Sequence, residues 1–73
     1  MAKTIYSKEH KNLVERLIKA RISCGLSQKA TAERLKKSQS YISKLESGQR
    51  RVDVVELKQI AVVYKKDFKY FIM

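Results

Sequence analysis

The fold is decided by residues 27–48, which read SQKATAERLKKSQSYISKLESG. Ser27 and Ser38 each stand directly before a short run with helical spacing, and a serine hydroxyl in that position accepts a hydrogen bond from the unpaired N–H groups of a helix start. Gly48 closes the stretch, because glycine adopts the left-handed conformation of helix C-terminal caps without steric strain. The pattern therefore predicts two short helices on either side of a tight turn, over about residues 28–35 and 39–47.

The apolar residues of these two helices can be buried together only if the helices cross steeply. They are Ala32, Leu35, Ile42 and Leu45. A steep crossing leaves the outer face of the second helix projecting from the domain, and that face carries Gln39, Ser40, Ser43 and Lys44. Glutamine suits bidentate contact with adenine, lysine reaches guanine acceptors or phosphate, and serine allows close approach. The pattern favours a helix that enters the major groove of DNA, with an ordinary solvated helix face as the alternative.

The sequence before this stretch predicts a longer helix. It is expected to begin after Ser7, which can serve as N-cap, and to run to about Cys24, where Gly25 ends it. Its apolar residues recur at helical spacing and are Leu13, Val14, Leu17, Ile18 and Ile22.

The sequence after the stretch predicts two more helices. Asp53 and Glu56 have the spacing of a capping box, and Asp67 can cap a short last helix. The apolar stripe of the fourth helix is Leu57, Ile60, Ala61 and Tyr64, and the last helix carries Phe68, Phe71 and Ile72. The valines at 54, 55, 62 and 63 would also suit a strand, but the cap and the stripe favour a helix. The chain is therefore predicted to be all-α, with five helices in a compact domain.

The charge of the chain points to a polyanionic partner. The 73 residues have room for one domain and carry a formal net charge of +10. Residues 1–52 hold +9 of that charge, so the basic field belongs to the part that contains the two short helices. Such a field attracts polyanions, which makes nucleic acid or an anionic membrane the natural partner.

Cysteine usage and hydropathy indicate the compartment. Cys24 is the single cysteine, which excludes an intramolecular disulfide and a cysteine-based zinc site. The first residues lack the apolar core of a signal peptide, and the longest apolar stretch, Ile60–Tyr64, is too short to span a bilayer. The protein is therefore expected to be cytoplasmic.

The spacing of residues 25–48 resembles that of the lambda-repressor and Cro family of helix-turn-helix proteins, the xenobiotic-response-element type. The family pattern is matched by Gly25-Leu26-Ser27-Gln28, by Ala32, and by Ser38-x-x-x-Ile42-Ser43-x-x-Glu46-x-Gly48. The resemblance extends roughly from Leu13 to Ile72. It implies a five-helix fold, a single domain over residues 1–73 with its motif at about 27–48, and homodimers on inverted-repeat operators. It also implies repressor-like regulation of transcription, with double-stranded DNA as partner and no cofactor.

The resemblance further implies roles for individual residues. Gln28 is expected to touch a phosphate and brace Gln39. Four residues are expected to face base edges: Gln39, Ser40, Ser43 and Lys44. Ser38 opens the same helix, and Ser47, Arg50 and Arg51 are expected to hold the DNA backbone beyond it. Arg21 and Glu46 fall where the family pairs an arginine of the first helix with a glutamate of the third, so a structural ion pair is expected.

Three residues depart from the family pattern. Thr31 stands where an early apolar residue of the second helix is usual, Lys36 replaces the turn glycine, and Lys37 replaces the apolar residue that follows it. A lysine at the turn must either accept a left-handed conformation, at a cost of about 1 kcal/mol, or force a different turn. Lys36 and Lys37 either add phosphate contacts or are solvated helix ends.

The aromatic C-terminal segment supports two different interpretations. Its last four residues, 70–73, offer apolar surface for a homodimer contact. The segment 68–73 also suits an antitoxin or anti-regulator whose main role is to bind a protein partner. A third interpretation, membrane binding by the basic first helix, is disfavoured by the serine caps and the steep two-helix pattern.

No catalytic or metal-binding residue is expected. His10 has no second metal ligand nearby in the sequence. Ser43 and Lys44 point in different directions from a helix, and no acidic residue accompanies them as it would in a nucleophilic site. The sequence therefore predicts that the protein is not an enzyme.

Overall fold

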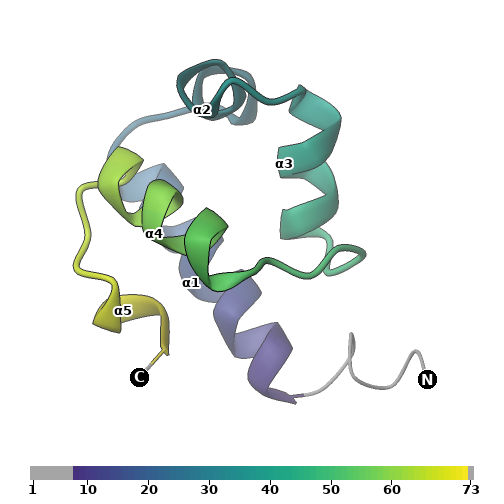
Figure 1. Ribbon diagram of the computed structural model, residues 1–73, viewed down its shortest axis with the longest axis vertical. Coiled ribbons are helices and arrows are strands. Elements are labelled where there is room, and N and C mark those ends of the chain that lie inside the picture. Colours follow the sequence, from purple (N-terminus) through teal and green to yellow (C-terminus); the bar gives the residue numbers. More distant parts are fainter. Residues whose placement is uncertain (1–7, 73) are drawn as a thin grey trace.

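The computed structural model describes residues 8–72, which form five helices (Figure 1). Their bounds are Lys8–Ser23 (α1), Gln28–Leu35 (α2), Gln39–Glu46 (α3), Val54–Val63 (α4) and Lys69–Ile72 (α5). Residues 8–72 contain no strand, so the predicted all-α fold of five helices is confirmed and the valines of α4 are helical. The expected N-cap of α1, Ser7, lies outside the described residues.

The helices are arranged around α1 and α4. α2 packs on α3 and α4, while α3 and α5 each contact α1. In Figure 1, α3 and α5 lie on opposite sides of the molecule, with α1 and α4 between them. The second helix of the motif and the C-terminal helix therefore belong to different surfaces. No helix within residues 8–72 combines the length and the apolar character needed to cross a membrane.

Side-chain caps explain where four of the helices begin. The Ser27 and Ser38 hydroxyls each accept a hydrogen bond from the N–H three residues further on, at 3.0 and 3.2 Å. Asp53 and Glu56 form the predicted capping box, in which each carboxylate accepts from the backbone N–H of the other residue. The Asp67 carboxylate accepts from the N–H two residues on, at 2.9 Å. These side chains satisfy N–H groups for which the helix has no internal acceptor.

The turn between α2 and α3 has Lys36 in the left-handed conformation, at φ 59° and ψ 42°. The Lys36 N–H donates to the Glu33 carbonyl at 3.2 Å and the Lys37 N–H donates to the Ala32 carbonyl at 2.9 Å. This is the hydrogen-bond pattern with which helices usually end on glycine. Of the two alternatives open from the sequence, the lysine therefore adopts the strained backbone. Lys65, after α4, does the same at φ 57°.

The core lies where the five helices meet. Its buried apolar residues are Leu17, Ala20, Ala32, Ile42, Leu45, Leu57, Ile60, Ala61, Tyr64 and Phe71. The stripe predicted for α4 is confirmed in full, and of the residues predicted for α2 and α3 all are buried except Leu35, which is half-buried. Thr31 is also fully buried, and its hydroxyl donates to the Ser27 carbonyl at 2.9 Å. That bond explains how a polar residue occupies this usually apolar position.

The apolar stripe predicted for the first helix is wrong at its end. Ile22 is 62% exposed, whereas Leu17 and Ala20 are buried. A helix turns by about 100° per residue, which places Ile22 roughly 200° from Ala20 and hence on the other side of α1. The apolar stripe of α1 therefore does not include Ile22.

Candidate nucleic-acid interface

One side of α3 is exposed along its whole length. At about 100° per residue, its exposed positions and the following cap residue fall within an arc of about 140°. These residues are Gln39, Ser40, Ser43, Lys44 and Ser47. Ile42 and Leu45, on the other side, are buried in the core. The structure therefore brings the residues expected to face DNA bases onto one helix face, and Ser38, also exposed, caps the start of that helix.

An ion pair fixes the inner side of α3 to α1. Arg21 Nε lies 2.6 Å from Glu46 Oε2, and Arg21 Nη2 lies 3.1 Å from Glu46 Oε1. A third bond runs from Arg21 Nη1 to the Leu26 carbonyl, at 2.8 Å, so the guanidinium also holds the loop before α2. The two side chains are only 15% and 8% exposed. The hydrogen bond to Glu46 outweighs burial and raises the pKa of Arg21, which therefore stays charged.

Gln28 joins this pair from α2. Its Nε2 donates to Glu46 Oε1 at 3.1 Å. Among residues 8–72 the Gln28 amide is directed to Glu46, and the expected brace between Gln28 and Gln39 is not formed. Gln28 instead links the start of α2 to the end of α3.

Positive charge surrounds the exposed face of α3. Between residues 36 and 52 the sequence holds five basic residues and one acidic residue, Glu46, whose charge is paired with Arg21. The basic residues are Lys36, Lys37, Lys44, Arg50 and Arg51, and all five are exposed. Arg50 is paired with Glu56, but the other basic residues still give this side of the molecule an excess of positive charge, which favours the approach of a polyanion.

A cluster that the sequence did not reveal lies beside this face, around the half-buried ring of Tyr41. The Arg50 guanidinium carbon is 4.7 Å from the ring centroid and the Lys37 ammonium is 5.3 Å from it. Arg50 Nη2 also forms an ion pair with Glu56 Oε2 at 3.1 Å. A signal was present in the capping box, because it fixes Glu56 near the loop that carries Arg50. Pairing across three elements, however, depends on the folded chain.

The protonation states within this cluster are fixed by its surroundings. Burial, together with the Glu56 carboxylate, raises the pKa of Tyr41 to about 12. Burial alone would raise the pKa of Glu56, but hydrogen bonding to the Asp53 N–H and the nearby Tyr41 and Arg50 groups outweigh it and lower that pKa. At neutral pH the phenol is therefore neutral and the carboxylate is charged.

Two short helices that cross over a tight turn, with the outer face of the second one exposed and flanked by cations, define a helix-turn-helix domain. Comparison with protein families gives a match to the helix-turn-helix family HTH_3, the Cro and C1 type, over residues 17–71. The chain belongs to this family. DNA is the partner that membership indicates, and a domain of this family that fills almost the whole chain is typical of proteins that are not enzymes. None of the curated proteins compared with the chain matches it.

Proposed function

We propose that this chain is a cytoplasmic transcriptional regulator of the repressor type, which binds an inverted-repeat operator as a homodimer. In this proposal α3 is the recognition helix and lies in the major groove. The observation that carries it is the single exposed face of α3, flanked by basic residues and held from behind by the ion pair between Arg21 and Glu46.

The proposal divides the interface residues into two groups. Gln39, Ser40, Ser43 and Lys44 read base edges, because they occupy the exposed arc of α3. Gln28, Ser47, Arg50 and Arg51 contact phosphates at either end of the helix and carry no sequence information. The division follows from position: the first group lies on the helix face, and the second lies where α2 begins and where α3 gives way to the loop.

The experiment selects binding sites from a library of random DNA duplexes. Two enriched half-sites are expected, in inverted orientation and about 10 base pairs apart from centre to centre. One helical turn of DNA is about 34 Å long, which accommodates one protomer of 32 × 25 × 20 Å per half-site. Enrichment of no sequence over the starting library would refute sequence-specific recognition.

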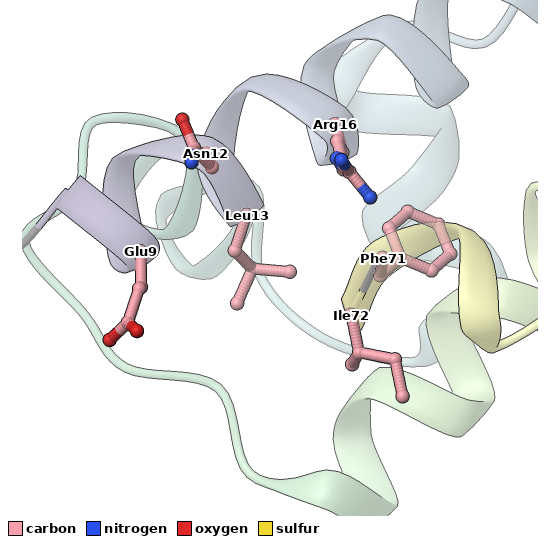
Figure 2. Close-up of a pocket in the computed structure, with 6 residues that line it drawn as sticks. All are labelled: Glu9, Asn12, Leu13, Arg16, Phe71 and Ile72. Atoms are coloured by element: carbon pink, nitrogen blue, oxygen red, sulfur yellow. The ribbon is translucent and has the colours of Figure 1, made fainter.

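The homodimer contact is proposed at a hollow between α1 and α5, with a second copy of the chain as its occupant (Figure 2). Glu9, Asn12, Leu13 and Arg16 line it from α1, opposite Phe71 and Ile72 of α5. The hollow has a volume of about 400 Å³.

Two features of this surface favour a copy of the same chain. Ile72 is 59% exposed at the edge of the hollow, so an apolar projection and an apolar recess lie side by side, as a two-fold contact requires. Glu9 and Arg16 supply opposite charges within the same patch. Arg16 Nη1 also donates to the Tyr70 carbonyl at 2.7 Å and so fixes α5 in place.

The dimer contact is tested by Ile72→Asp. Sedimentation should show a dimer for the unaltered chain and a monomer for the variant, because a buried unpaired carboxylate opposes association. Val62→Asp is the matched control, because Val62 is a 77% exposed residue of α4 that does not line the hollow. A variant at Ile72 that remains dimeric at low concentration would place the interface elsewhere.

A further inference from the structure

Two cations from opposite ends of the recognition helix meet on one aromatic ring. Lys37 precedes α3 and Arg50 follows it, yet both lie against Tyr41, at 5.3 and 4.7 Å from the ring centroid. Both distances are within the range of about 6 Å over which the negative face of an aromatic ring attracts a cation. Both cations are therefore attracted to the same ring, and the two distances place them at most about 10 Å apart.

Arg50 is also held from a second helix. Its Nη2 lies 3.1 Å from Glu56 Oε2, and the other oxygen of that carboxylate accepts from the Asp53 N–H at 3.1 Å within the capping box of α4. The guanidinium is thus fixed between α3 and α4 although its side chain is 45% exposed. A guanidinium has five N–H donors, and the ion pair with Glu56 uses one of them.

We propose that Lys37 and Arg50 form a phosphate-binding site for the DNA backbone beside the recognition helix, with Tyr41 and Glu56 as positioning residues. The inference rests on the proposed DNA binding and deepens it in two respects. It assigns Lys37, which the sequence left open, to the interface, and it gives Tyr41 a role although it faces no base. The ligand is a backbone phosphate of a duplex, bound without regard to sequence.

The geometry suits this ligand because each cation already has partners that restrict its position: the Tyr41 ring for Lys37, and the ring and Glu56 for Arg50. Arginine and lysine lose much rotamer freedom when they bind, and side chains already fixed lose less. Glu56 is only 16% exposed against 45% for Arg50, so an approaching phosphate meets the guanidinium before the carboxylate. The neutral phenol adds no negative charge that would repel the phosphate, since burial and Glu56 raise the pKa of Tyr41 to about 12.

The first test measures binding of the full chain to a duplex of scrambled sequence at 50 and 200 mM salt, by fluorescence anisotropy. Each lost phosphate contact should reduce the slope of log K against log salt by about 0.9, which shrinks the affinity ratio between these two salt concentrations about 3.5-fold. Lys37→Gln and Arg50→Gln should each show this loss. Lys66→Gln is the matched control, because Lys66 lies 5.0 Å from the Tyr70 ring in the C-terminal part and its loss removes the same charge.

The second test asks whether the ring acts through the cations. As a single substitution, Tyr41→Leu should reduce the slope of log K against log salt. It should have no further effect on that slope in a chain where Lys37 and Arg50 are both replaced by glutamine. Tyr41→Phe keeps the ring, so its slope of log K against log salt should stay close to that of the unaltered chain. Thermal unfolding checks that each variant is folded, and if Tyr41→Leu does not fold, the charge variants alone decide.

Three results separate the possible failures. Equal effects of Tyr41→Leu in both backgrounds would reduce Tyr41 to a packing residue and overturn its positioning role. Slopes for Lys37→Gln and Arg50→Gln that equal the slope for Lys66→Gln would overturn the phosphate site. An unaltered chain that binds duplex with no salt dependence, or not at all, would instead refute the proposed function.

Discussion

Replacing Glu46 with leucine should destabilise the domain strongly, because it leaves the Arg21 guanidinium without its carboxylate. The two side chains are 15% and 8% exposed, and two nitrogens of Arg21 bond to the two carboxylate oxygens. Removing one member of a fully buried pair costs about 3–5 kcal/mol. The partial exposure of this pair places the expected loss near the lower end, at about 3 kcal/mol.

That loss is large for a chain of this size. At about 0.05–0.15 kcal/mol per residue, 73 residues give a free energy of unfolding of about 4–11 kcal/mol. A loss of about 3 kcal/mol should lower the Tm by about 12–24 °C in a domain of 60–100 residues. Circular dichroism during thermal unfolding measures this, and Glu33→Leu, on the exposed side of α2, is the control.

Replacing both partners, in the double variant Arg21→Met with Glu46→Leu, has a different expected effect. With both charges gone, no buried ion is left unpaired, and the Leu26 carbonyl loses its bond from Arg21 Nη1, which costs about 1 kcal/mol. The double variant should therefore be more stable than Glu46→Leu alone. Two results would refute this account of the ion pair. One is a loss of less than about 1 kcal/mol in the free energy of unfolding of Glu46→Leu, and the other is a double variant less stable than Glu46→Leu.

Three further predictions concern the interface and the turn. Gln39→Ala should remove about 1–3 kcal/mol of discrimination at one base pair, whereas Arg51→Ala should weaken binding to specific and scrambled duplexes alike. A competition assay that finds an unchanged specificity ratio for Gln39→Ala would contradict this. Lys36→Gly relieves the left-handed strain but gives the unfolded chain more conformational entropy, so it should leave the free energy of unfolding unchanged or raise it by up to about 1 kcal/mol. Lys37→Gly relieves no such strain and should lower the free energy of unfolding. The fold raises the pKa of Tyr41 from 10.0 to about 12, so the stability gained from the neutral phenol is complete below pH 10 and is lost between about pH 10 and 12. Between pH 10 and 12 the Tm of Tyr41→Phe should therefore fall less than the Tm of the unaltered chain.

The helix boundaries could be predicted from the sequence because caps are local. Ser27, Ser38 and the Asp53 capping box bond to N–H groups three residues away, so the relevant atoms are close in the sequence as well as in space. The stripe of α4 was predictable for a similar reason, since a helix buried along one side repeats its apolar residues at a fixed spacing. Ile22 shows where this reasoning fails: it follows Ile18 at helical spacing, yet it lies on the side of α1 away from buried Ala20 and is exposed.

The contacts that orient α3 could be predicted only in part. The pair of Arg21 and Glu46 was expected from a family resemblance, but the choice of Gln28 between two acceptors depends on how α2 and α3 cross. The Tyr41 cluster depends on three elements at once and so leaves no periodic signal in the sequence. The conformation of Lys36 was open for another reason, because the strain of a left-handed lysine is small enough for packing of the two helices to outweigh it.

The orientation of α3 depends on polar as well as apolar contacts. α2 and α3 have eight residues each, and each helix buries two of them: Thr31 and Ala32 in α2, Ile42 and Leu45 in α3. The bonds that Arg21 and Gln28 make with Glu46 join α3 to α1 and to the start of α2, so their loss is expected to change how α3 is oriented. The double variant Arg21→Met with Glu46→Leu therefore tests recognition as well as stability. It should fold and keep its salt-dependent binding to scrambled DNA, but discriminate less between the selected operator and other sequences.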